Sequence, residues 1–260
     1  MKLSVIIITK NEAAHIRDCL DSVKFANEWI IVDSGSTDGT QDIARAFGAT
    51  VIETADWPGF GPQKNRALDA AHGEWILSLD ADERIPDALR DEILAAIAAP
   101  AHDAYALPRL SSFCGRFIHH AWYPDYIVRL FKRGQARFSP SLVHESAVVE
   151  RGTERTIGKL RNHIIHYSYA DDDAFLRKLT QYSTLGAQQA FAAGKRCGYG
   201  KAVLHALSAF LRMFVFKRGF LDGHAGLMVA VMAAEMTYHK YFKLMLLTEN
   251  EKAAKREARS

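Results

Sequence analysis

Cysteine, long apolar runs and net charge are all scarce in this sequence, and each scarcity excludes a class of protein. Three cysteines in 260 residues, with no C-x-x-C pair, argue against a disulfide scaffold or a zinc ribbon and fit a reducing compartment. No apolar run reaches the roughly 18 residues of a membrane-spanning helix. The first apolar run ends at Ile8 and is too short for a signal peptide, so we interpret it as a strand. A net charge of only +3 gives no reason to expect a nucleic-acid binder.

The chain is nonetheless rich in apolar residues, which make up 48% of it, and its length suits one α/β domain with a smaller appendage. Strand and helix patterns alternate over the first hundred residues, which predicts a doubly wound, mostly parallel sheet. The expected strands are 5–8, 29–32, 50–53 and 75–79, and the expected helices are 13–23 with Asn11 as N-cap, 40–47, 62–71 and 86–98. Short strands follow near 104–107, 126–131, 136–138 and 162–167, and helix follows from Asp172.

The small net charge conceals an uneven distribution. Residues 1–194 carry 21 basic and 25 acidic side chains, whereas residues 195–260 carry 12 basic and 5 acidic ones. In the basic part, apolar stretches such as 202–216 are followed by cations such as Lys217 and Arg218. Amphipathic helices of this kind are typical of proteins that lie on an anionic membrane. Packing of the same helices on the sheet, or in a dimer, is the alternative.

Polar residues follow the predicted strands, and ligands of an open parallel sheet bind beyond the carboxyl ends of its strands. Asp33 ends the second strand and opens a loop of small and hydroxyl residues, although such a loop also forms turns and caps by itself. Asp80 and Asp82 follow the fourth strand, and paired carboxylates are suitable ligands for a hard divalent cation. The glycines at 59 and 61 do not follow the first strand, so they do not form a dinucleotide fingerprint.

Together these segments resemble the inverting family 2 glycosyltransferases of the GT-A fold. The matching segments in the first hundred residues are Val5–Glu12, Ile31–Thr40, Gln63–Ala67 and Leu79–Glu83. The rest is similar to the subgroup that includes lipopolysaccharide core β-1,4-glucosyltransferases. Its matching segments are Pro124–Tyr126, Arg129–Phe131, Val143–Glu145, His166–Tyr169 and Arg218–Gly223. The resemblance implies a GT-A nucleotide-diphospho-sugar transferase fold with C-terminal amphipathic helices.

The resemblance also implies how the nucleotide-sugar donor is bound. Asp33 would hold the base, and Thr9 and Glu12 would line the nucleoside pocket. Lys64 and Arg129 carry charges suited to phosphate, although such side chains are more often solvated or ion-paired. The expected donor is a UDP-sugar, with UDP-glucose suggested by the subgroup.

The same resemblance assigns the metal and the base. Asp80 would face the ribose or the sugar, and Asp82 would bind Mg²⁺ or Mn²⁺ on the diphosphate. His166 is a further candidate ligand, with a buried core histidine as the alternative. Glu145 would be the general base, unless it is an ordinary surface glutamate.

The resulting prediction is an enzyme that transfers a sugar to a lipopolysaccharide core or similar glycolipid. Residues 1–194 would form the catalytic domain, with a nucleotide-binding half at 1–100 and an acceptor half at 101–170. Residues 195–247 would form membrane-surface helices on the inner face of the cytoplasmic membrane, and 248–260 a charged tail. The alternatives are a polyprenyl-phosphate glycosyltransferase and a non-catalytic module that binds nucleotide sugars.

Overall fold

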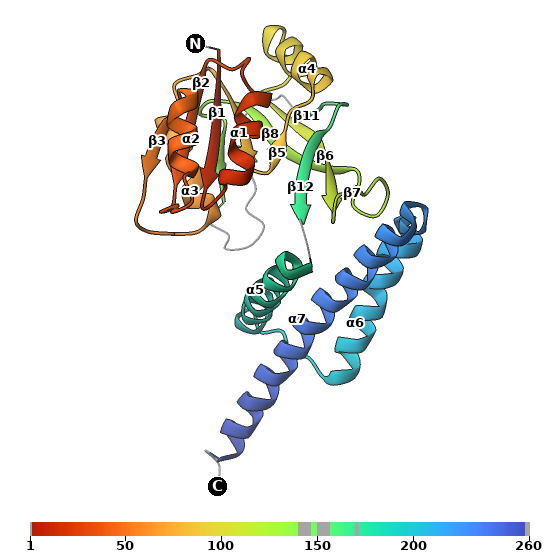
Figure 1. Ribbon diagram of the computed structural model, residues 1–260. Coiled ribbons are helices and arrows are strands. Elements are labelled where there is room, and N and C mark those ends of the chain that lie inside the picture. Colours follow the sequence, from red (N-terminus) through yellow and green to blue (C-terminus); the bar gives the residue numbers. More distant parts are fainter. Residues whose placement is uncertain (1, 140–146, 150–156, 170–171, 258–260) are drawn as a thin grey trace. The chain divides into compact units, whose positions relative to one another are not determined.

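Strands and helices alternate through the first hundred residues, as the sequence pattern predicts (Figure 1). The structure is a computed structural model that describes residues 2–139, 147–149, 157–169 and 172–257. Its first elements are β1 (Leu3–Thr9), α1 (Ala13–Ser22), β2 (Glu28–Asp33), α2 (Thr40–Phe47), β3 (Thr50–Glu53), α3 (Phe60–Ala70), β4 (Trp75–Asp80), β5 (Glu83–Arg84) and α4 (Asp87–Ala98).

The following strands vary in length and are mostly antiparallel. They are β6 (Ala104–Phe113), β7 (Arg116–Phe117), β8 (Asp125–Lys132), β9 (Ala136–Phe138), β10 (Ala147–Val149), β11 (Gly158–Lys159) and β12 (Ile164–Tyr169). The main sheet has the order β3-β2-β1-β4-β8-β6-β12-β5. Its first four strands are parallel, whereas β8 runs antiparallel to both β4 and β6.

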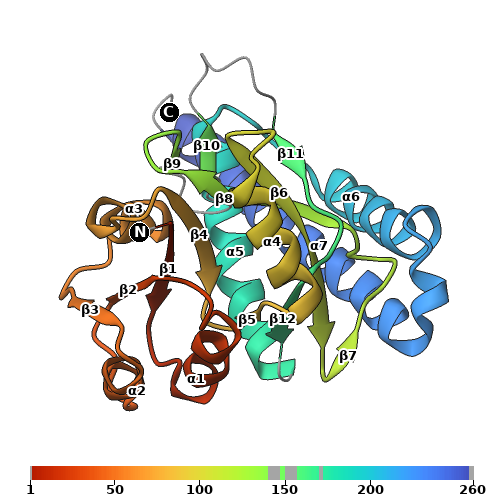
Figure 2. The same ribbon diagram turned by 90° about the horizontal axis from the view of Figure 1, so that it is seen from above.

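Helices cover both faces of the parallel strands, which explains the uninterrupted apolar run in β1. All seven residues of β1 are buried. Leu3, Val5 and Ile7 share a core with α1, α2 and α4. Ile6 and Ile8 alternate with them and share a second core with α3. Figure 2 shows α3 on one side of β1 and β2, with α1 and α2 on the other.

The chain divides into two compact units. Unit 1 contains residues 1–110 and 124–167, and unit 2 contains residues 111–123 and 168–260. The helices of unit 2 are α5 (Asp172–Ala192), α6 (Tyr199–Leu211) and α7 (Gly223–Glu257), with a π-helical turn η1 (Arg212–Phe216) and a 3₁₀ turn η2 (Gly219–Asp222). The expected boundary at residue 194 therefore falls inside unit 2, because α5 and α6 both pack against α7.

Unit 2 has its own core, in which Phe113 and Ile118 pack against Phe175 of α5 and Val229 of α7. Asp222 fixes the edge of this core, because its carboxylate accepts hydrogen bonds from the backbone N–H groups of residues 119, 120 and 121. These bonds outweigh the effect of burial and keep the pKa of Asp222 below its ordinary value. Within the described part of the chain, no helix is both long and apolar enough to cross a membrane.

The start of α1 differs from the prediction that Asn11 is its N-cap. Asn11 has a left-handed backbone (φ 57°), and its side-chain oxygen accepts the N–H of Thr37 instead. The N-cap position belongs to Glu12, whose N–H donates to the hydroxyl of Thr40 at 2.8 Å. The next N–H, of Ala13, donates to Asp38 at 2.9 Å. The loop after β2 thus caps the helix after β1.

Candidate functional site

The carboxyl ends of three neighbouring strands bring the first predicted residues together. Thr9 lies opposite Asp33 in the β1–β2 register, and Ile8 lies opposite Asp80 in the β1–β4 register. Glu12 follows at the start of α1. The prediction that these strand ends meet at one edge of the sheet is confirmed by this register.

Asp33 is completely buried, and no cation is paired with it among the described residues. One carboxylate oxygen accepts the N–H groups of Gly35 and Ser36 and the amide of Gln41, and the other accepts the hydroxyls of Thr9 and Ser36. Burial raises the pKa of Asp33, but the hydrogen bonds from Ser36, Gln41 and Thr9 lower it more, so the net pKa is below its ordinary value. A nucleoside that reaches this carboxylate has to replace one of these donors.

Asp80 is held between two buried cations. Lys64 Nζ lies 2.9 Å from one of its oxygens, and Arg129 donates to the other. Burial raises the pKa of Asp80, but the charges of Arg129 and Lys64 keep it well below its ordinary value. The alternative foreseen for Lys64 and Arg129, an ion pair, is thus what the structure contains. Both carboxylate oxygens of Asp80 are already engaged.

Asp82 and His166 are brought together by a short antiparallel pairing of β5 with β12. Glu83 lies opposite His166 in that pairing, so the preceding residue, Asp82, approaches the imidazole. His166 Nε2 is 3.4 Å from Asp82 Oδ2, and the two side chains are 12% and 23% exposed. A carboxylate and an imidazole are both accepted by Mn²⁺ and related cations. No group of three or more His, Cys, Asp or Glu side chains suited to a metal occurs among the described residues, so a cation held here would need further ligands.

A buried acid and an arginine that were not predicted extend this cluster. Glu83 is fully buried and accepts hydrogen bonds from Arg129 at 2.8 Å and from Arg109 at 3.4 Å. Arg109 in turn pairs with Asp125 at 2.7 Å. Glu83 directly follows the two aspartates, and Asp125 belongs to a matched segment. The sequence signals available were therefore the position of Glu83 beside the aspartates and the matched segment that contains Asp125, the partner of Arg109.

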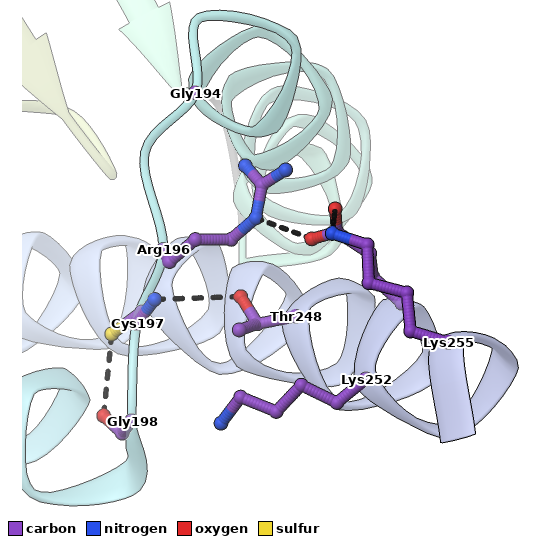
Figure 3. A pocket seen from close by; sticks show the side chains of 8 residues that line it. Gly194, Arg196, Cys197, Gly198, Thr248, Lys252 and Lys255 are labelled. Carbon is purple, nitrogen blue, oxygen red and sulfur yellow. Dashed lines mark hydrogen bonds and ion pairs between the residues drawn. The ribbon is translucent and has the colours of Figure 1, made fainter. Parts of the chain in front are cut away.

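A separate cavity of about 600 Å³ lies in unit 2, beside the connection between α5 and α6 (Figure 3). Three cationic side chains, Arg196, Lys252 and Lys255, contribute to its lining. Arg196 and Lys255 both pair with Glu251, at 2.6 and 2.7 Å, and their hydrogen bonds lower the pKa of Glu251 to about 2. Lys252 pairs with Glu249 at 3.0 Å, so each of the three cations has an acidic partner within the protein. None of the predicted site residues lines this cavity.

Comparison with known proteins identifies the family. Residues 4–151, more than half of the chain, match the family described as glycosyl transferase family 2. The chain belongs to that family. The lipopolysaccharide core biosynthesis glycosyltransferase LpsC of Rhizobium meliloti is 30% identical to it, over 93% of this chain and 93% of LpsC. An uncharacterised glycosyltransferase of Rickettsia typhi is 31% identical, over 95% of this chain and 88% of the relative.

Solved structures agree on the fold of this family 2 glycosyltransferase. The mannosyltransferase PcManGT of Pyrobaculum calidifontis, in complex with GDP-Man and Mn²⁺, has a TM-score of 0.56 at 17% identity and covers 94% of this chain and 87% of its own. Residues 1–349 of S. aureus TarS in complex with UDP-GlcNAc have a TM-score of 0.52 at 15% identity, with 98% and 92% covered. The expected GT-A fold is therefore confirmed, and at these identities the likeness concerns the fold alone.

Most, but not all, of the predicted site residues of this family 2 glycosyltransferase lie inside the segment that matches the family. Thr9, Asp33, Asp80 and Asp82 lie inside residues 4–151, and His166 lies beyond them. Glu145, the predicted general base, lies inside the matched segment but outside the residues that the structure describes. Its role stays a prediction from the sequence.

Proposed function

We propose that this enzyme transfers a sugar, with inversion, from a UDP-sugar to a lipopolysaccharide core or similar glycolipid, and that the sugar is glucose. The observation that carries the proposal is the approach of Asp82 to His166 at the strand edge where Thr9, Asp33 and Asp80 also lie. The relationship to LpsC supports the acceptor class. The complexes of PcManGT with GDP-Man and of TarS with UDP-GlcNAc support a nucleotide-sugar donor.

The donor would lie along the ends of β1, β2 and β4. Asp33 would accept a hydrogen bond from the base or the ribose, with Thr9 and Glu12 lining the nucleoside pocket. The buried hydrogen-bond network of Asp33 holds its carboxylate ionised and in one orientation. Binding of the donor therefore costs less conformational entropy, because this side chain is already ordered.

The diphosphate would lie near Asp82 and His166, which would hold Mg²⁺ or Mn²⁺. When bound, the cation would offset the negative charge that develops on the departing diphosphate. Asp80 would face the ribose or the sugar. Because both of its oxygens are already engaged by Lys64 and Arg129, we expect it to act largely by keeping these two cations beside the donor.

An inverting transfer is a single in-line displacement at the anomeric carbon. The acceptor oxygen forms a bond to that carbon while the bond from the carbon to the diphosphate oxygen breaks. The hydroxyl proton must leave the acceptor oxygen, and Glu145 would accept it as general base. No covalent intermediate with the protein is required, so the site needs a base and a means of stabilising the leaving group, but no nucleophile.

The test uses purified full-length enzyme, UDP-glucose, Mn²⁺ and a truncated lipopolysaccharide core, with product detected by mass spectrometry. Glu145→Gln is expected to lower the rate by at least about a hundredfold, the lower end of what general acid–base groups contribute. Asp82→Asn is expected to lower it by at least as much, because a bound cation contributes several kcal/mol to the stabilisation of the leaving group. Glu53→Gln removes an exposed carboxylate on β3 and serves as the matched control. Full activity of Asp82→Asn would refute the metal assignment, and full activity of Glu145→Gln would refute the base.

A second measurement identifies the donor. Thermal unfolding is followed with UDP-glucose, UDP-GlcNAc and GDP-mannose, each with and without Mn²⁺, because a ligand that binds only the native state raises the midpoint. We expect the largest rise with UDP-glucose and Mn²⁺. A larger rise with another nucleotide sugar would assign a different donor to the same site. If UDP-glucose is bound but the glycolipid receives no sugar, a polyprenyl phosphate becomes the acceptor to test.

We also propose that the enzyme works on the anionic surface of the inner leaflet. Many large apolar side chains of α6, η1 and η2 are exposed: Val203, Leu204, Leu207, Leu211, Val215, Phe216, Phe220 and Leu221. Residues 203, 207, 211 and 215 recur at a spacing of four and lie on one side of the helix. Residues 174–221 contain eight basic and no acidic side chains. Exposed apolar groups among cations favour an anionic lipid surface over a second copy with the same charge.

A further inference from the structure

We propose that Glu83 is a positioning residue that fixes the turn carrying Asp82 and sets the local charge for cation binding. This inference rests on the proposed function, because it concerns the same Asp82 and His166 pair. It adds a residue with no role in the donor, metal or base assignments.

The contacts of Glu83 join the turn to the sheet. One carboxylate oxygen accepts the backbone N–H of Asp80 at 3.0 Å, which closes the turn over residues 80–83. The other oxygen accepts Arg129 at 2.8 Å and Arg109 at 3.4 Å. Because Glu83 is fully buried, its carboxylate takes the place of water as the acceptor for these three donors. A glutamine would keep one acceptor oxygen but would turn an NH2 group toward the donors on the other side.

The same residue lies at the point where β12 joins the turn. Glu83 is opposite His166 in the β5–β12 pairing, and the N–H of Tyr167 donates to the carbonyl of Asp82 at 3.0 Å. Arg84 donates to the carbonyls of Ala81 and Glu83, both at 2.9 Å. Movement of the Glu83 side chain would therefore shift the backbone on both sides of Asp82, and with it the approach to His166.

Charge provides the second argument. Lys64, Asp80, Arg129, Glu83, Arg109 and Asp125 form a continuous series of alternating ion pairs with three cations and three anions. Asp82 stands outside this balanced series, so its carboxylate remains to attract a divalent cation. Glu83→Gln would leave the series with one excess positive charge close to Asp82, and that charge would repel a divalent cation in a poorly solvated site. A role in packing alone would not have this effect.

The decisive measurement is Mn²⁺ binding by the full-length protein, with and without UDP, followed by the electron paramagnetic resonance signal of free Mn²⁺. We expect Glu83→Gln to weaken Mn²⁺ binding by about tenfold or more, the range found when partners of metal ligands are replaced. Glu28→Gln is the matched control. Glu28 is a half-buried glutamate at the opposite end of β2, where it pairs with Ser4 and His72. We expect it to retain the affinity of the wild type.

The outcomes separate this inference from the proposed function. If the wild type and Asp82→Asn bind Mn²⁺ equally, or if neither binds it, the metal assignment fails and the inference fails with it. If Asp82→Asn loses Mn²⁺ while Glu83→Gln keeps it, only the role of Glu83 is refuted. Should Glu83→Gln not fold, Arg109→Gln replaces it. Arg109 touches Glu83 and is part-exposed, and its removal leaves an excess negative charge, so Mn²⁺ binding that is as tight as or tighter than in the wild type is expected. Weakened binding in that variant would overturn the charge argument.

Discussion

At the scale of single residues, Asp33 is unusual because it is a fully buried carboxylate held by neutral donors alone. Asp33→Asn replaces one acceptor oxygen by an amide donor that faces the hydroxyls or N–H groups already directed at it. We expect a loss of about 1–3 kcal/mol in the free energy of unfolding, the cost of unsatisfied buried hydrogen-bonding groups. Urea denaturation measures it. Asp42→Asn, on an exposed aspartate of α2, should change stability by less than about 0.5 kcal/mol.

The same carboxylate makes stability depend on pH in a known direction. The pKa of Asp33 is lower in the folded protein than in the unfolded chain, where it is about 3.9. Its contribution to stability is therefore complete above that value and is lost as the pH falls through the lower, folded-state pKa. Denaturation curves recorded between pH 6 and pH 3 should lose stability less steeply for Asp33→Asn than for the wild type. Parallel curves would contradict this account.

The position of a site residue was predictable from the sequence where the strand pattern determines it. Asp33 and Asp80 were placed correctly at a common edge because each ends a buried strand. The partners of Asp80 were not predictable, since Lys64 is 16 residues before it and Arg129 is 49 residues after it. Glu83 was not given a role because an acid in a turn normally faces water, and only the tertiary contacts of Arg109 and Arg129 account for its burial.

At the scale of elements, the close approach of η2 to α7 depends on a glycine. A Cβ atom at Gly226 would lie 1.8 Å from the carbonyl oxygen of Gly219, which is backbone and cannot rotate away. Gly226→Ala is expected to destabilise unit 2 by about 3 kcal/mol or more, because overpacking forces the backbone apart. Thermal unfolding and urea denaturation both report the change.

Gly200 provides the control for that prediction. It lies near the start of α6, and a Cβ atom there would meet no atom within 4 Å. Gly200→Ala should be neutral or should stabilise the protein by up to about 1 kcal/mol, since alanine loses less backbone entropy in a helix. Equal losses for the two variants would mean that the contact between η2 and α7 is not tight.

Elements with strong local signals were predicted well. The helix at 40–47 ends where expected because Gly48 adopts a left-handed backbone (φ 99°). Strand β6 was predicted to end near Leu107 but continues to Phe113, with Pro108 paired to Tyr126 inside it. Proline normally interrupts a strand, and here the sheet contacts on either side override that preference.

At the scale of the whole molecule, the proposed binding to an anionic membrane rests on the contrast between an acidic body and basic apolar helices. Substitution of two exposed residues, Phe216 (80% exposed) and Leu204, tests this proposal. The double variant Leu204→Ser, Phe216→Ser should bind anionic vesicles at least about tenfold more weakly, because each exposed apolar side chain contributes about 1.5–3 kcal/mol when it enters an apolar phase. Cosedimentation with phosphatidylglycerol vesicles measures the difference.

The stability of this double variant is its own control, since exposed side chains add little to the fold. The melting midpoint should stay within a few degrees of the wild type, whereas Phe175→Ser, in the core of unit 2, should lower it strongly. Binding by the wild type should also weaken as salt rises from about 0.05 to 0.5 M, since the Debye length falls over this range. Binding that ignores both salt and the substitutions would refute the membrane proposal.

The reciprocal capping between the loop after β2 and the start of α1 has a further consequence for local hydrogen exchange. The amides of Asn11, Glu12 and Ala13 donate to Ser36, Thr40 and Asp38, and the amide of Thr37 donates back to Asn11. Neither segment can open alone without leaving the other unsatisfied. Their amide hydrogens should therefore exchange with solvent at similar rates, as one cooperative unit. A nucleotide that engages Asp33 would then slow exchange at the start of α1 as well.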